Sequence, residues 1–163
     1  AVDPLIAGCA ALNARHGVAE RLAPALEDWL APLWSKLDPV FSDGRDATLM
    51  GAACRLSDIG SRLHPDHRGD LVFDQVLRAP IPGQSHAERA FIATAAFRRY
   101  VGDRPPTEPT VARVLSEERI ARADALGAAI RLGCDLSGRS PELLAASSLA
   151  RSKTDLTLTV KKD

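Results

Sequence analysis

Residues Leu49–Asp70 read LMGAACRLSDIGSRLHPDHRGD, an apolar stretch followed by a cluster of cations. Apolar residues recur at helical spacing on or beside one face, namely Leu49, Met50, Ala52, Ala53, Leu56 and Ile59. We expect Gly60 to end this helix in the left-handed conformation and Pro65 to prevent its continuation. The helix would carry the carboxylate of Asp58 in its last turn, beside a cationic loop, and this arrangement indicates a functional site.

Cations in that loop and in a later helix could form a local positive patch. They are Arg55, Arg62, His64, His67, Arg68, Arg98, Arg99 and Arg104. Because a guanidinium group offers phosphate oxygens a planar fork of donors, such a cluster suits a polyanion. The alternative is an ordinary solvated surface, on which the neighbouring aspartates Asp58, Asp66, Asp70 and Asp103 pair with the arginines.

The length and charge of the chain limit its possible partners. Its 163 residues suffice for one domain with a substantial core, and its formal net charge is zero. A neutral chain has no global basic field, so we expect neither nucleic acid nor an anionic membrane as partner, and any anion site must be local. We find no apolar run of roughly 18 residues and no charged leader, and we therefore expect neither a membrane span nor a signal peptide.

The cysteines indicate a reducing compartment. Cys9, Cys54 and Cys134 lie in apolar stretches without CxxC spacing. An odd number of such residues is typical of buried thiols, so we expect a cytoplasmic protein without disulfides. Since the sequence does not begin with Met, we also expect it to be a piece of a longer chain.

Helical periodicity and capping residues predict a mainly α fold. Caps are expected at Asp3, at Asp46, and at Ser85 and Ser116, the last two within capping boxes. The predicted helices cover residues 4–16, 18–37, 46–60, 68–77, 85–100, 111–115, 117–137 and 141–146. Pro24 and Pro32 predict a break or bend in the second helix, and we expect Leu71, Val72 and Val76 to be buried by the fourth.

The end of the chain departs from this helical pattern. Leu156–Val160 alternates apolar residues with threonine, which predicts a strand that pairs either locally or with sequence beyond residue 163. We therefore expect a helical domain over residues 1–150 and a β-strand tail over residues 151–163.

A metal site is one interpretation of the histidines. His16, Asp58, His64 and His67 could bind Zn²⁺ or a harder metal if the fold brought them together. In the alternative, His16 lies at a helix C-terminus, where a cation is favoured, and Asp58 accepts backbone or arginine hydrogen bonds. No nucleophile–base pair, GxSxG motif or P-loop is present in the sequence.

Three segments together resemble a known family of domains. They are ACRLSDIGSRLHPDHRGD (Ala53–Asp70), HAERAFIATAAFRRYVGD (His86–Asp103) and LGAAIRLGCDLSGRSPELLAASSL (Leu126–Leu149). The sequence is similar to the helical C-terminal domain of the Ppx/GppA family, the exopolyphosphatases and guanosine pentaphosphate phosphohydrolases. The opening Asp3–Gly17 and the closing Thr154–Val160 also fit, and the resemblance is greatest to alphaproteobacterial members.

The resemblance implies an HD-like helical bundle with a short C-terminal β element. HD phosphohydrolases bind metal through a histidine, an adjacent His-Asp pair and a later aspartate. The matching positions here are His16, Ser57-Asp58 and Cys134, so two of the four ligands remain. A divalent ion needs more donors than these, and we expect no metal or cofactor in this chain, although Mg²⁺ is expected for the whole enzyme.

The resemblance also implies that catalysis and polyphosphate binding lie in different domains. The catalytic residues of the family lie in N-terminal actin-like domains that this sequence lacks, so we expect no catalytic residue here. The whole protein would hydrolyse the terminal phosphate of inorganic polyphosphate or of guanosine pentaphosphate (pppGpp). This chain would contribute a homodimer contact and polyphosphate binding, for which the candidate residues are Arg62, His64, His67, Arg68, Arg98 and Arg99.

Two other functions remain open at this point. One is a metal-dependent HD phosphohydrolase that acts on nucleotides through His16 and Asp58. The other is a helical dimerisation module with no ligand, for which the arginines would be solvated surface.

Overall fold

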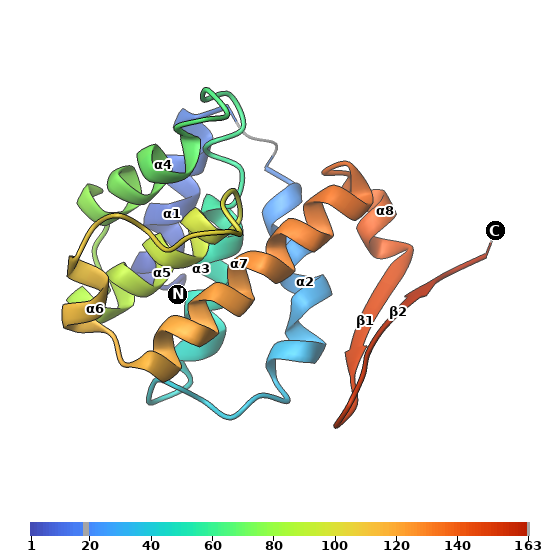
Figure 1. Cartoon of the computed structure of the whole chain (residues 1–163). Coiled ribbons are helices and arrows are strands. Elements are labelled where there is room, and N and C mark those ends of the chain that lie inside the picture. The colour runs from blue at the N-terminus through green and yellow to red at the C-terminus, as the bar shows by residue number, and fades with distance from the viewer. Residues whose placement is uncertain (18–19, 163) are drawn as a thin grey trace.

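The computed structural model describes residues 1–17 and 20–162, and this part of the chain is mainly helical (Figure 1). Its eight α-helices are α1 (Pro4–Arg15), α2 (Leu22–Trp34), α3 (Arg45–Leu56), α4 (Arg68–Arg78), α5 (His86–Arg98), α6 (Thr110–Val114), α7 (Glu117–Ser137) and α8 (Pro141–Ala145). Two strands, β1 (Ser147–Arg151) and β2 (Leu156–Val160), follow as an antiparallel hairpin. The predicted mainly α fold with a short C-terminal β element is confirmed.

Helix α5 lies at the centre of the bundle, with α3, α4, α6 and α7 packed around it. All eight residues from Ala90 to Phe97 are buried, which is typical of a helix covered on every side. Its two phenylalanines meet aromatic rings of other segments edge-to-face, Phe91 with Phe41 at 5.2 Å and Phe97 with Phe73 at 6.4 Å between ring centroids. Such pairs stabilise the core beyond the area that they bury.

Helix α7 crosses α5 at very short range, and Gly127 permits the approach. A Cβ atom on Gly127 would lie 2.4 Å from Arg98 Cβ and 2.5 Å from the Ala95 carbonyl oxygen. The middle of α7 therefore lies directly over the C-terminal end of α5. Helix α7 ends at Ser137, as predicted, and Gly138 follows it in the left-handed conformation with a φ of 58°.

The C-terminal hairpin packs on the bundle mainly through β1. Leu149 of β1 is buried, and the Trp29 indole Nε1 of α2 donates a hydrogen bond of 3.1 Å to Ser147 Oγ. Strand β2 pairs with β1 in a register that places Leu158 opposite Leu149, but it is exposed along its whole length. The predicted strand at 156–160 is confirmed, and its partner is local. The division into 1–150 and 151–163 stays a prediction, and β1 extends across that boundary.

Several predicted caps are confirmed. The Asp3 carboxylate accepts from the Leu5 N–H at 2.8 Å, and Ser85 with Glu88 forms a complete capping box at the start of α5. Ser116 caps α7 by accepting from the Arg119 N–H, but the predicted capping box is wrong there. The third residue of α7 is Arg119, and a guanidinium group cannot accept from the backbone N–H of the cap.

Two predictions for the central helix are wrong. Asp46 does not cap α3, because its carboxylate turns back to accept from the Val40 and Phe41 N–H groups at 3.0 and 3.2 Å. The helix ends at Leu56, before Gly60, and Gly60 has no positive φ. A Cβ atom at Gly60 would lie 2.6 Å from Val72 Cγ2, so the glycine serves close packing and not a left-handed turn.

The limits of two other helices differ from the prediction. Helix α2 begins at Leu22, and the predicted start at Val18 lies outside the described residues. Pro24 therefore lies in the first turn, where no intrahelical hydrogen bond is lost, while Pro32 lies inside the helix. On α4, Leu71 is 49% exposed, contrary to prediction, because the buried face comprises Gly69, Val72, Phe73 and Val76.

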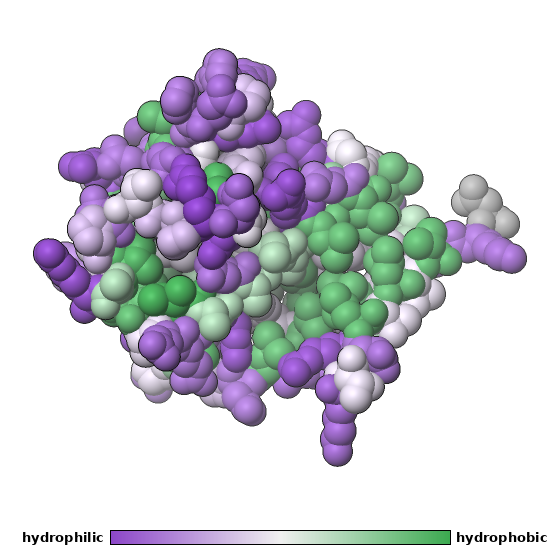
Figure 2. Space-filling model, in the orientation of Figure 1, coloured by the Kyte–Doolittle hydropathy of each residue, from purple (hydrophilic) through white to green (hydrophobic). Residues whose placement is uncertain are grey.

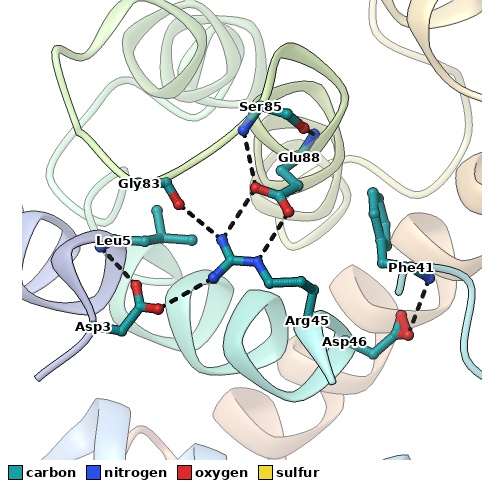
Figure 3. A network of polar contacts seen from close by, with 8 residues as sticks. All are labelled: Asp3, Leu5, Phe41, Arg45, Asp46, Gly83, Ser85 and Glu88. Carbon is teal, nitrogen blue, oxygen red and sulfur yellow. Dashed lines mark hydrogen bonds and ion pairs between the residues drawn. The ribbon is translucent and has the colours of Figure 1, made fainter. Parts of the chain in front are cut away.

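One guanidinium group joins the beginnings of three helices (Figure 3). Arg45, the first residue of α3, pairs through Nε with Glu88 of α5 at 2.9 Å and through Nη1 with Asp3 before α1 at 3.2 Å. Its Nη2 donates to the Gly83 carbonyl at 2.8 Å. Burial would raise the pKa of Glu88, but the hydrogen bonds from Arg45 and Ser85 outweigh it and lower that pKa.

We predict that Arg45→Ala lowers the free energy of unfolding by about 2 kcal/mol, since it removes hydrogen bonds to charged groups that are largely buried. Urea denaturation measures the change. The control is Arg78→Ala, which breaks an exposed pair with Asp74 on α4 and should leave the midpoint nearly unchanged. Equal midpoints for the two variants would contradict the proposed role of Arg45.

Candidate functional site

Arginines from four parts of the chain converge on one pocket of about 510 Å³. It lies where the turn after α3, the start of α4 and the ends of α5 and α7 meet. Its charged lining residues are Asp58, Arg68, Arg99, Arg131, Asp135 and Arg139. Four guanidinium groups face two carboxylates, so the pocket carries a local positive excess in a chain of zero net charge. We call it the arginine pocket.

At the base of the arginine pocket, Asp58 lies between two arginines. Arg139 Nη1 is 3.1 Å from Asp58 Oδ2, and Arg99 Nη2 is 3.7 Å from Asp58 Oδ1. Asp58 is 6% exposed and Arg99 is 9% exposed. Among the described residues, neither Asp58 Oδ1 nor Arg99 Nε has a hydrogen-bond partner. A buried charged group without its full set of hydrogen bonds destabilises the fold. The pocket therefore has one acceptor and one donor that a ligand could pair with.

The backbone after α7 bends to bring Arg139 to Asp58. Gly138 and Arg139 are consecutive left-handed residues, with φ of 58° and 64°. The left-handed conformation costs a non-glycine residue about 1 kcal/mol or more. The strain is local to the residue whose side chain reaches Asp58, which supports a functional reason for it.

Tyr100 supports the pocket from below. Its hydroxyl donates to the Ser57 carbonyl at 2.9 Å and accepts from the Gly60 N–H at 3.1 Å, which holds the turn that carries Asp58. The guanidinium carbons of Arg99 and Arg68 lie 4.8 and 5.3 Å from the centre of its ring. These cation–π contacts orient both arginines toward the pocket.

The positions that match the HD metal ligands do not fit a divalent cation. Cys134 lines the pocket, but burial raises the pKa of its thiol, and the Ser57 hydroxyl donates to the Cys54 carbonyl. His16 does not line the pocket; its Nε2 lies 2.6 Å from Gln75 Nε2 of α4. Within residues 1–17 and 20–162 no group of three or more His, Cys, Asp or Glu residues could hold a metal ion. Arginines surround the remaining carboxylate, Asp58, and would repel a cation.

The predicted cation patch is divided by the structure. Arg68 and Arg99 line the arginine pocket, whereas Arg98 pairs with Asp124 at 2.7 Å and lines a neighbouring cavity. The loop residues Arg62, His64 and His67 are exposed, and the rings of the two histidines lie 5.7 Å apart. The six candidates therefore do not form one cluster.

Sequence reasoning missed Arg131, Arg139 and Tyr100 as site residues. Arg131 precedes Cys134 by three residues on α7, a helical spacing that places both on one face and could have indicated it. No spacing rule connects Arg139 with Asp58, which is 81 positions away. Their contact depends on how α7 crosses the bundle.

A mainly helical domain with an arginine-lined pocket belongs among candidate anion-binding domains. The family model of the exopolyphosphatase C-terminal domain matches residues 36–163, so the chain belongs to this family. Among curated proteins, none matches the chain. In the part of the chain that the structure describes, no helix is both long and apolar enough to cross a membrane.

We predict that Tyr100, the single tyrosine of the chain, titrates late. Burial raises its pKa from 10.0 to about 12, with the cation of Arg99 opposing the effect. Since the folded-state pKa is raised, the stabilising contribution is complete below pH 10 and is lost as the pH rises toward 12. Tyrosinate absorbance measures the midpoint. The same titration in denaturant, with a midpoint near 10, is the control, and a native midpoint near 10 would contradict the burial of the hydroxyl.

Proposed function

We propose that this chain is the polyphosphate-binding part of an exopolyphosphatase, with the arginine pocket as its main contact. The observation that carries the proposal is the buried guanidinium of Arg99, whose Nε lacks a hydrogen-bond partner among the described residues. Arg68, Arg131 and Arg139 surround the same space. Phosphate oxygens are the acceptors that fit such a set of charged, planar donors.

A phosphate chain could leave the arginine pocket by either of two routes. Ser61 lines the pocket, and the exposed basic residues Arg62, His64 and His67 follow it in the sequence. Arg131 and Asp135 line both this pocket and the neighbouring cavity of about 520 Å³, where Arg98 lies. The contacts of a polyanion with several such cations add together, and their strength falls with salt.

The test is the affinity of medium-length polyphosphate at roughly 50 and 200 mM salt. We predict that Arg68→Ala with Arg131→Ala weakens binding by roughly 10- to 100-fold, because each lost charge-assisted contact costs about 1 kcal/mol. The salt dependence should also become shallower.

The control is Arg113→Ala, which removes the same charge from an exposed position on α6, away from the pocket lining. It should bind like the wild type. Absence of binding at the lower salt concentration, or an equal loss in both variants, would exclude the arginine pocket as the binding site.

Other parts of the proposal come from the family. In the whole protein, actin-like domains outside this sequence would hydrolyse the terminal phosphate of polyphosphate or pppGpp with Mg²⁺, in the cytoplasm. The relation to the HD fold and to alphaproteobacterial members also stays a prediction. The alternative of an HD metallohydrolase has no support in the arginine pocket, where cations surround Asp58.

A homodimer is the second candidate role, and an apolar groove favours it. A space of about 770 Å³ lies between α2, α7 and the hairpin, and Figure 2 shows the apolar surface over this face. Leu156 and Val160 of β2 are 57% and 62% exposed, and the outer edge of β2 pairs with no other described strand. An uncharged, alternating edge strand is a template for strand pairing. We therefore propose that β2 of a second copy pairs antiparallel with this edge.

We predict that the chain sediments as a dimer and that Leu156→Glu converts it to a monomer, because a charge on the apolar face of β2 would be buried at the contact. The matched control is Leu71→Glu, at an exposed leucine of α4, which should leave the dimer intact. A monomeric wild type, or a dimer that survives Leu156→Glu, would reject this contact.

A further inference from the structure

We infer that the arginine pocket selects the end of a phosphate chain, a phosphate group that still carries a proton, over an internal phosphate. The inference deepens the proposed function and rests on it. It comes from the acidic residue at the base of the pocket, which plain anion binding leaves unexplained.

Asp58 is ill suited to a site for a fully ionised anion. Its carboxylate is buried, and Oδ1 has no hydrogen-bond partner among the described residues. Arg139 occupies Oδ2 at 3.1 Å, while Arg99 remains 3.7 Å from Oδ1, beyond hydrogen-bonding distance. A carboxylate is an acceptor only, so an approaching phosphate oxygen is repelled unless that oxygen bears a proton.

Other charged groups around Asp58 do not remove this requirement. Arg99 faces it from α5 and Arg139 from the segment after α7, and both are donors. Arg131 and Asp135 pair with each other at 3.5 Å on α7, with about half of each side chain exposed or more. Tyr100 and Cys134 stay neutral at neutral pH, because burial raises the pKa of each. Among the described residues, Asp58 Oδ1 therefore remains a buried acceptor without a partner, on a residue that lines the pocket.

The ends of a phosphate chain differ chemically from its middle. An internal phosphate has one ionisable oxygen and is fully ionised at neutral pH. A terminal phosphate has a second ionisation, and the pKa of this ionisation is near 6 for a phosphate monoester. The end of the chain can therefore carry a P–OH group near neutral pH. Such an end could donate its proton to Asp58 Oδ1 and accept hydrogen bonds from Arg99 and its neighbours through the other oxygens. Free orthophosphate shares this chemistry.

The test compares linear tripolyphosphate with cyclic trimetaphosphate, which has three phosphates and no end. We expect the wild type to bind the linear ligand about tenfold more tightly or better, the factor expected of one charge-assisted hydrogen bond. Asp58→Asn should lower the ratio of the affinity for the linear ligand to the affinity for the cyclic ligand. A purely electrostatic role of Asp58 predicts the reverse, because removal of a negative charge helps the more highly charged linear ligand more.

The matched control is Asp135→Asn, which removes a negative charge from the same pocket at an exposed side chain. It should keep or raise the ratio. An independent measurement on the wild type covers the case in which Asp58→Asn does not fold: the terminal phosphorus resonances of tripolyphosphate should broaden more than the central one. Equal broadening, or a ratio that rises in Asp58→Asn, would overturn the inference.

Orthophosphate distinguishes the two sources of a protonated phosphate. Displacement of tripolyphosphate by equal concentrations of orthophosphate would assign the site to free phosphate, and resistance would assign it to a chain end; either result supports selection of the protonated group. If linear and cyclic ligands bind equally and with salt dependence, the inference fails while the proposed function stands. If neither ligand nor polyphosphate binds, the proposed function fails.

Discussion

The close crossing of α7 over α5 at Gly127 determines where the arginine pocket forms. At this point backbone and Cβ atoms of α5 occupy the space that a side chain would need. Helix α7 has 21 residues and is therefore about 31 Å long, so its position at the crossing fixes where its far end lies. That end carries Arg131, Cys134 and Arg139 to the turn after α3, although Asp58 is 81 positions from Arg139. The arginine pocket is thus a product of helix packing.

The network around Arg45 and the arginine pocket lie at different ends of the bundle. Around Arg45, each polar group of the network has a partner, and one side chain joins the starts of α1, α3 and α5. Around Asp58, the chain keeps an unpartnered acceptor, an unpartnered donor and a left-handed arginine. Buried groups of this kind destabilise a fold. Their concentration in one pocket is what a ligand-binding function would explain.

Local signals in the sequence predicted much of the fold. The caps at Asp3 and Ser85, the helix end at residue 137 and the strand at 156–160 depend on near neighbours, and the structure confirms them. The errors have a different origin. The Asp46 carboxylate accepts a hydrogen bond from the Val40 N–H, and Gly60 packs closely against Val72; both contacts outweigh the local preference of the residue. Strand β1 has no clear alternation of apolar and polar residues, because only Leu149 in it is buried. For the site, the sequence led to Arg68, Arg99 and Asp58, whereas Arg131 and Arg139 needed the tertiary structure.

The side-chain NMR signal of Arg99 reports directly whether phosphate binds in the arginine pocket. Its Nε–H group is buried and has no partner among the described residues, so a phosphate bound in the arginine pocket should shift that resonance strongly. The Nε–H of Arg45, already bonded to Glu88, is the internal reference and should not move. A shift of Arg99 that saturates with added polyphosphate is the predicted result. An unchanged Arg99 signal at a polyphosphate concentration that saturates binding would show that polyphosphate does not bind in the arginine pocket.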